Sequence, residues 1–256
     1  MKKTILYRIS SKGYPKLKIT SVSKLDCLNN LFRTFENWNF ICVADNCDDE
    51  LLDTLRKYTF NKFYVTKLGN PGSFWKLYEE GLNSSNREDL FYFVEDDYFH
   101  LPKSPMAIEE GLEIFDYVTL YDHPDKYQFF QKNLNPYTKK NRFSETTEVT
   151  YSNNFIWRTT NSTTMSFAVT GQTLQDDFDI WKITRDLKKD HDFDNFCVLT
   201  KQKFILKSRM IKQLPKKLRF IMKPRKYLGL CIPGLALHLE KTYMRLNDYT
   251  RFNIPQ

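Results

Sequence analysis

The stretch Leu90-Phe-Tyr-Phe-Val-Glu-Asp-Asp-Tyr98 joins five apolar residues to three consecutive carboxylates. A continuous apolar run of this length is typical of a strand that is buried on both faces of a parallel sheet. Three adjacent carboxylates repel one another unless water or a cation neutralises them. The stretch therefore predicts a central strand that ends in an acidic group, at the edge where open α/β sheets bind ligands.

Strands and helices alternate on both sides of this run. Before it, the apolar pattern predicts strands at Thr4–Ile9, Phe40–Ala44 and Lys62–Lys67 and helices at Ser21–Glu36, Glu50–Tyr58 and Phe74–Leu82. After it, the pattern predicts strands at Tyr117–Tyr121 and Thr163–Val169, a long polar loop at Asn141–Asn161, and helices at Leu174–Leu187 and Phe193–Thr200. This order predicts an α/β fold of the Rossmann-like type, with a mixed, mostly parallel central sheet flanked by helices.

Composition excludes several classes of protein. The chain has 256 residues, of which 16% are aromatic and 41% hydrophobic, far too apolar for a disordered segment. No run of eighteen uncharged apolar residues is present, and no signal-peptide core follows the first residues, which predicts a cytoplasmic protein. The five cysteines are odd in number and never spaced as Cys-x-x-Cys, so a zinc site or a disulfide framework is not expected.

The positive charge is concentrated near the C-terminus. Eleven Lys or Arg and no Asp or Glu lie between Lys201 and Lys226, so the rest of the chain carries 28 minus 31 charges, or −3. We therefore divide the chain into a catalytic domain at 1–200 and a basic segment at 201–256 that completes the active site. Because the charge is confined to one segment, nucleic acid is not the expected partner. The segment is either a helical surface in water or a peripheral contact with an anionic membrane.

Two further motifs follow predicted strands. Asp45 ends the second strand, where it either closes an Asx turn or accepts a hydrogen bond from a nucleobase. Gly69-Asn-Pro-Gly-Ser73 comes before a predicted helix. If the central strand continues past its apolar run, Glu95 and Asp97 point to one side, where they suit a hard cation that also binds phosphates. The alternative is a solvated acidic loop that caps the next helix.

In these motifs the chain resembles the GT-A-fold nucleotide-sugar glycosyltransferases, broadly those of family 2, including small glycosyltransferase domains of viruses and bacteria. Glu95-Asp96-Asp97 is similar to the Asp-x-Asp metal motif of that family, with Glu in place of the first Asp. The resemblance implies Mn²⁺ or Mg²⁺ as cofactor, with Asp97 as the better ligand and Glu95 as a less direct one. The donor-binding residues that it implies are Ile9, Ser10, Asp45, Gly72, Ser73, Lys76, Glu95, Asp96 and Arg219.

Two later segments extend the resemblance. Asp192 lies in an acidic stretch that opens a predicted helix, where such enzymes place the catalytic base; it also suits a helix N-cap. His238 lies in a C-terminal segment in which some members place a histidine on the metal. The alternative for His238 is a hydrogen-bonded core residue. Trp157, Arg158 and Thr160 combine an aromatic ring with polar groups that would suit a sugar acceptor, or they are ordinary loop residues.

The sequence thus predicts an enzyme that transfers a sugar from a nucleoside diphosphate sugar, first of all a UDP-sugar, to a hydroxyl of a glycan or lipid-linked acceptor. The expected outcome is inversion by single displacement, although GT-A folds support both outcomes. Two other functions remain open. One is a metal-dependent nuclease or phosphotransferase that uses the acidic triplet, and the other is a non-catalytic GT-A-like binding module.

Overall fold

The computed structural model describes residues 1–11, 21–84, 86–123, 147–186, 192–201, 223–240, 244 and 246–254. Its main feature is a nine-stranded sheet with the order β3-β2-β1-β4-β9-β6-β10-β8-β7. The strands of this sheet are β1 (Lys3–Ile9), β2 (Asn39–Asp45), β3 (Lys62–Thr66), β4 (Leu90–Glu95), β6 (Tyr117–Thr119), β7 (Val149–Tyr151), β8 (Ile156–Thr160), β9 (Phe167–Thr170) and β10 (Leu228–Ile232).

Most of these strands run in one direction. The first four neighbours, β3, β2, β1 and β4, are parallel, and β9 is antiparallel to both β4 and β6. Because β10 is parallel to β6 and β8 is antiparallel to β10 and β7, only β9 and β8 run against the rest. The predicted fold class, a mixed and mostly parallel sheet flanked by helices, is confirmed.

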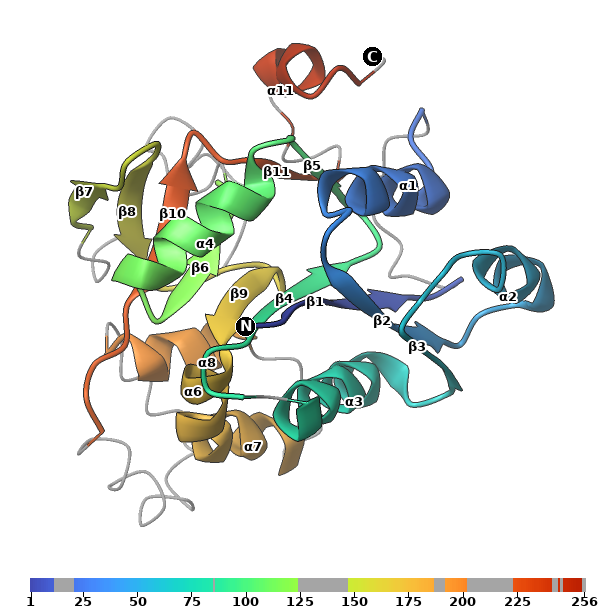
Figure 1. The fold of residues 1–256 in the computed structure, drawn as a ribbon, viewed down its shortest axis with the longest axis horizontal. Coiled ribbons are helices and arrows are strands. Elements are labelled where there is room, and N and C mark those ends of the chain that lie inside the picture. The colour runs from blue at the N-terminus through green and yellow to red at the C-terminus, as the bar shows by residue number, and fades with distance from the viewer. Residues whose placement is uncertain are drawn as a thin grey trace, which may run out of the picture.

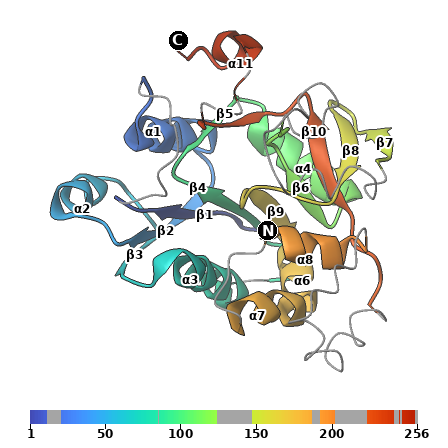
Figure 2. The ribbon, with the colours of Figure 1, turned by 180° about the vertical axis from the view of Figure 1, so that it is seen from behind.

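Helices cover both faces of the sheet, so the molecule has three layers (Figure 1). On one face, α1 (Lys24–Thr34), α2 (Asp49–Leu55) and α4 (Ser104–Ile114) contribute Leu28, Leu55 and Ile108 to the core. On the other, α3 (Gly69–Ser84), α6 (Gly171–Asp176), α7 (Phe178–Asp186) and α8 (Asp192–Leu199) bring Trp181 and Phe196 against Phe167. Figure 2 shows the same layers from behind. Both layers bury large aromatic side chains, which accounts for the aromatic content of the chain.

A second, two-stranded sheet lies at one edge of the molecule. It pairs β5 (Tyr98–His100) with β11 (Ala236–His238), and the register sets His238 opposite Tyr98. The short helix α11 (Leu246–Arg251) lies beyond this small sheet (Figure 1). Among the described residues, no helix is both long and apolar enough to cross a membrane.

Several predicted elements differ from the observed ones. The predicted loop at 141–161 is wrong from residue 149 on, because Val149–Tyr151 and Ile156–Thr160 pair as an antiparallel hairpin. The helix expected from Phe74 begins earlier, at Gly69, whose positive φ of 73° suits a residue without a Cβ. The helix expected over 174–187 is two helices, α6 and α7. β5, α4, β10, β11 and α11 were not predicted, and residues 202–222 of the basic segment, for which a helical surface was one alternative, lie outside the described residues.

Candidate active site at the carboxyl ends of the strands

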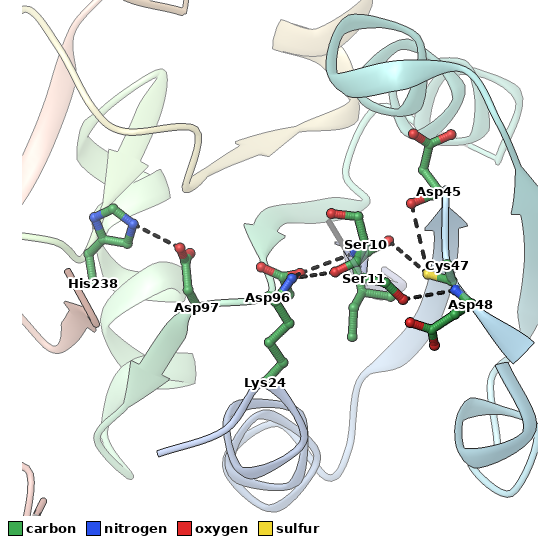
Figure 3. A network of polar contacts seen from close by, with 10 residues as sticks. Ser10, Ser11, Lys24, Asp45, Cys47, Asp48, Asp96, Asp97 and His238 are labelled. Carbon is green, nitrogen blue, oxygen red and sulfur yellow. Dashed lines mark hydrogen bonds and ion pairs between the residues drawn. The ribbon is translucent and has the colours of Figure 1, made fainter. Parts of the chain in front are cut away.

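The carboxyl ends of β1, β2 and β4 meet at one edge because these strands are parallel neighbours. Ser10 and Ser11 follow β1, and Cys47 and Asp48 follow Asp45 at the end of β2. The acidic triplet begins with Glu95, the last residue of β4. Figure 3 shows Ser10, Asp96 and Lys24, which reaches in from α1, as one group of polar contacts, with the Asp97–His238 pair beside it. The ligand edge predicted from the strand order is thus assembled from residues far apart in the sequence.

Glu95 is paired with Arg8, the next-to-last residue of the apolar strand β1. One Arg8 nitrogen donates to Glu95 and another donates to the carbonyl oxygen of Asn70 at 2.8 Å, so the arginine joins β1, β4 and the first turn of α3. Burial raises the pKa of Glu95, and the neighbouring guanidinium offsets part of that rise. Arg8 therefore offsets part of the cost of burying a carboxylate at the sheet edge.

Asp96 is held by Lys24 and by the end of β1. The Lys24 ammonium lies 2.6 Å from Asp96 Oδ2 and also donates to the carbonyl oxygen of Ser10. The Ser10 N–H donates to the same carboxylate oxygen at 3.1 Å. Lys24 is the first residue of α1, whose N-terminus is fixed by a capping box between Ser23 and Asp26. This network connects the ends of β1 and β4 to the start of α1.

Asp97 contacts His238 across 141 positions of sequence, with 3.1 Å between Asp97 Oδ2 and His238 Nε2. The other ring nitrogen, Nδ1, lies 3.8 Å from a Glu240 carboxylate oxygen. The Tyr98 ring stacks on the imidazole with 4.9 Å between centroids and 14° between planes, and Tyr121 meets it edge-on at 5.7 Å. Two aromatic rings and two carboxylates therefore set the orientation of His238.

The Asp97–His238 pair is compatible with a divalent cation. Two adjacent ligands of an octahedral ion, each about 2.1 Å from it, stand about 3 Å apart, which matches the observed separation. Among the described residues, however, no group of three or more His, Cys, Asp or Glu side chains is arranged to hold a metal. The protein would supply two ligands, and substrate phosphates and water would complete the shell, as is usual for Mg²⁺.

Glu95 pairs with Arg8 and does not join the Asp97–His238 contact, so its role as a third metal ligand stays a prediction. The expectation assumed that the strand continues, so that Glu95 and Asp97 share a face. Instead β4 ends at Glu95 and a turn follows at Asp96 and Asp97, which breaks the alternation. Asp97 turns toward β11, and Glu95 stays with Arg8.

The Asp45 carboxylate is hydrogen-bonded mainly to the neighbouring strand β3 and the segment after it, and not in the Asx turn of the sequence-based alternative. Its Oδ1 accepts from the Thr66 hydroxyl at 2.8 Å and from the Leu68 N–H at 2.6 Å, and its Oδ2 accepts from the Asn46 side chain at 2.7 Å. The carboxylate thus fastens the end of β2 to the segment before α3. Ile9 is buried, and its carbonyl oxygen lies 3.5 Å from the Cys47 sulfur. A contact of Asp45 or Ile9 with a nucleobase stays a prediction.

The predicted donor residues of α3 have packing roles in the structure. A Cβ at Gly72 would come within 2.6 Å of the Leu68 Cβ, so the glycine makes room for that side chain. The Ser73 hydroxyl donates to the carbonyl oxygen of Asn70 at 3.0 Å. The Lys76 ammonium lies 2.6 Å from Glu80 and 4.0 Å from the centre of the Tyr64 ring. None of these partners belongs to the acidic triplet.

The predicted acceptor residues lie inside the fold. Trp157 is fully buried, with its indole N–H donating to Ser152 at 3.0 Å, so its ring face is not open to an acceptor. Arg158 forms a buried ion pair with Asp122, which follows β6, at 3.1 Å. Thr160 is also fully buried. The segment is a core strand and not a loop, so the alternative of ordinary loop residues is wrong, and the binding of an acceptor by these three residues stays a prediction.

The two remaining predicted residues are less fully described. Asp192 is the first residue of α8, as expected for a helix start, but its side chain lies outside the described part of the chain. Its contact with an acceptor hydroxyl stays a prediction. Arg219 lies outside the described residues.

Sequence reasoning missed Arg8, Lys24 and Tyr98. Arg8 carried a usable signal, since a charge inside an apolar strand requires a buried partner. Tyr98 directly follows the acidic triplet, but nothing in the sequence pairs it with His238. Lys24 begins an ordinary amphipathic helix, and only the packing of α1 against the sheet edge brings its ammonium to Asp96.

Comparison with known proteins gives similarity of fold alone. No protein-family model and no curated protein matches the chain. A solved fragment of S. aureus TarS, residues 1–349, is 16% identical with a TM-score of 0.41, over 70% of this chain and 49% of that one. The inositol-1-phosphate CTP transferase from T. maritima is 13% identical with a TM-score of 0.46, over 99% and 95% of the two chains. CMP:2-keto-3-deoxy-manno-octonic acid synthetase, solved with CTP, is 11% identical with a TM-score of 0.43, over 91% and 92%. These likenesses assign no residue of this chain a role.

Proposed function

We propose that this protein is a metal-dependent glycosyltransferase that moves a sugar from a nucleoside diphosphate, first of all UDP, to a hydroxyl of a glycan or lipid-linked acceptor. The observation that carries the proposal is the contact between Asp97 and His238 at the carboxyl end of the central strand. This contact joins the two residues that the sequence resemblance assigned to one metal. It also lies at the sheet edge where α/β folds bind nucleotides.

The acidic triplet supports a donor site through its pattern of charge pairing. Glu95 is matched by Arg8 and Asp96 by Lys24, each across a different element of the fold. Only Asp97 faces an imidazole, which can act as a neutral ligand. The triplet is therefore divided into two carboxylates with fixed cationic partners and one that is suited to a cation. A Mn²⁺ or Mg²⁺ ion at Asp97 and His238 would neutralise charge on the departing diphosphate.

Transfer with inversion is a single displacement. The acceptor oxygen bonds to the anomeric carbon while the bond from that carbon to the diphosphate oxygen breaks, and the electron pair leaves with the diphosphate. The Asp192 carboxylate would take the acceptor proton as the new bond forms. Arg8 and Lys24 hold the carboxylates of Glu95 and Asp96 in place, so the donor site requires little rearrangement before the chemical step.

A metal-dependent nuclease or phosphotransferase is less well supported. Such enzymes commonly use two ions about 4 Å apart, which requires a second set of ligands. The described residues hold no cluster of three or more metal-binding side chains, so this requirement is not met in that part of the chain.

The test is turnover with a panel of UDP-, GDP- and dTDP-sugars in the presence of Mn²⁺, Mg²⁺ or a chelator. Released nucleoside diphosphate reports transfer to water even when the acceptor is unknown. Asp97→Asn should lower the rate by on the order of a hundred-fold or more, because several kcal/mol of charge stabilisation depend on the cation. Asp53→Asn, on the exposed surface of α2, removes the same charge and is the matched control.

The outcomes separate the three functions. Donor cleavage that needs a divalent ion and Asp97 supports the glycosyltransferase. Binding of UDP without cleavage of any donor points to a binding module. Cleavage of nucleic acid without any effect on nucleotide sugars would replace the proposal with the nuclease.

A further inference from the structure

The chain between β8 and β9 makes a turn, residues 161–166, whose backbone is fixed from the core. The Tyr98 hydroxyl donates to the carbonyl oxygen of Thr164 at 2.7 Å. The carbonyl oxygen of Ser166 accepts from the hydroxyls of Thr119 at 2.9 Å and Thr163 at 2.8 Å. These donors come from β5, from β6 and from the turn itself, so the turn is held on two sides by buried structure.

One residue of this turn has an unfavourable backbone conformation. Met165 has a φ of 49°, in the left-handed region that bulky side chains rarely adopt. Two of the other non-glycine residues with positive φ, Asn46 and Asn253, are asparagines, which tolerate the region well. Strain of this kind persists where surrounding structure imposes it, and such residues cluster at functional sites. Here the hydrogen bonds to the carbonyl oxygens of Thr164 and Ser166, on either side of Met165, hold the backbone of Met165 in this conformation.

The turn lies beside the Asp97–His238 pair. Tyr98 connects them, since its ring stacks on His238 while its hydroxyl binds Thr164. Thr164 is half-buried, and its hydroxyl makes no hydrogen bond to any part of the chain that the structure describes. The neighbouring Thr163 hydroxyl, in contrast, is used inside the turn. Thr164 is thus a half-buried residue whose backbone is fixed by Tyr98, the same side chain that stacks on His238.

We infer that Thr164 is a sugar-binding residue, whose hydroxyl forms a hydrogen bond with a hydroxyl of the donor sugar. The inference rests on the proposed function and adds to it the residue that recognises the group being transferred. A pyranose attached to a diphosphate at Asp97 and His238 would meet the turn by extending past Tyr98, whose ring and hydroxyl link His238 to Thr164. A preorganised neutral hydroxyl suits this task because little conformational freedom is lost when the sugar binds.

The experiment separates the sugar from the nucleotide. Affinity for UDP and for the UDP-sugar that the wild type cleaves is measured by calorimetry with Mn²⁺, and their ratio isolates the contribution of the sugar. Thr164→Val keeps the branched shape and removes the hydroxyl, whereas Thr164→Ser keeps the hydroxyl. Thr150→Val makes the same chemical change on the exposed edge strand β7 and is the control.

Thr164→Val should weaken binding of the UDP-sugar by about 3- to 10-fold, the effect of one neutral hydrogen bond, and leave UDP binding unchanged. Thr164→Ser should restore most of the loss, and Thr150→Val should have no effect. Equal UDP-sugar affinity in wild type and Thr164→Val would overturn the inference while leaving the glycosyltransferase intact. An equal loss of UDP affinity would also overturn it, since that result means a structural role. If the wild type binds neither ligand, the proposed function fails and the inference fails with it.

Discussion

Two buried groups should make stability depend on pH in opposite directions. His100, on β5, is fully buried against Tyr92, with 2.8 Å between its Nε2 and the tyrosine hydroxyl, and burial lowers its pKa to about 3. Asp177 accepts a hydrogen bond from Tyr117 at 2.9 Å, and burial raises its pKa to about 6, although Lys226 and Lys223 oppose the rise and Asp116 adds to it. Both groups lie outside the proposed reaction, so their titration affects folding alone.

The signs follow from which state binds more protons. Below the unfolded pKa of 6.5, unfolded His100 is protonated while the folded residue stays neutral, so stability present near pH 7 is lost as the pH falls toward 3. Asp177 has the raised pKa, so its contribution is present below 3.8 and is lost as the pH rises through 6. Between pH 7 and pH 5, acidification lowers the free energy of unfolding by about 2 kcal/mol through His100 and raises it by about 1 kcal/mol through Asp177.

Conservative variants separate the two contributions. His100→Gln retains a side-chain amide near the Tyr92 hydroxyl, and Asp177→Asn retains an acceptor for Tyr117; neither new side chain titrates. Urea unfolding at pH 7 and pH 5 measures the change in the free energy of unfolding for each protein. The change in the free energy of unfolding from pH 7 to pH 5 should be about 2 kcal/mol more favourable for His100→Gln than for the wild type. For Asp177→Asn it should be about 1 kcal/mol less favourable. If the variants and the wild type changed by the same amount within about 0.5 kcal/mol, His100 would not be neutral in the folded state and the pKa of Asp177 would not be raised.

Three further predictions concern the site and the basic segment. Asp192→Asn should lower transfer on the order of a hundred-fold with unchanged calorimetric UDP affinity; a matching loss of affinity would assign Asp192 to the donor site instead. Cys47 is half-buried while the other four thiols are buried, so alkylation of the native protein at mildly alkaline pH should modify Cys47 first. The reaction should be slow, because burial raises the pKa of the Cys47 thiol, and bound UDP should protect it. Indifference to UDP would place the nucleotide elsewhere. The protein should co-sediment with anionic but not neutral liposomes at low salt, and Gln replacements should abolish this without affecting donor cleavage; equal retention on both would remove the membrane proposal. The Gln replacements are at Lys212, Lys216 and Lys217.

The N-terminal half of the fold could be predicted because its signals are local. β1, β2, β3 and β4 are short apolar runs separated by amphipathic helices, and parallel neighbours bring their carboxyl ends together without further information. The hairpin of β7 and β8 was missed for a local reason as well. Its residues are rich in Thr, Ser and Asn, and Trp157 gave the only strong sign of a core strand. In this part of the chain, composition favoured a loop and long-range pairing with β10 prevailed.

The roles of individual site residues were harder to predict than their neighbourhood. Asp45 was expected at the ligand edge and lies there, yet its carboxylate is occupied by Thr66 and Leu68, which are distant in sequence until β2 and β3 pair. Glu95 was expected on the same side as Asp97, but the strand ends at Glu95 and Asp97 lies in the turn that follows. Both differences arise from backbone geometry at strand ends, where the alternation of side chains stops.

The position of His238 shows how packing of leucines can place a polar residue. In β11 and the residue after it, Leu237 and Leu239 face one way and pack with Phe252 and Ile254 near the C-terminus. Alternation along the strand then requires Ala236 and His238 to face the other way, toward Tyr98 and Asp97. The sequence contains this alternation, but it does not say that β11 pairs with β5. Once that pairing is known, the burial of two leucines is sufficient to bring an imidazole to the end of the central strand, and the C-terminal residues thereby become part of the site's support.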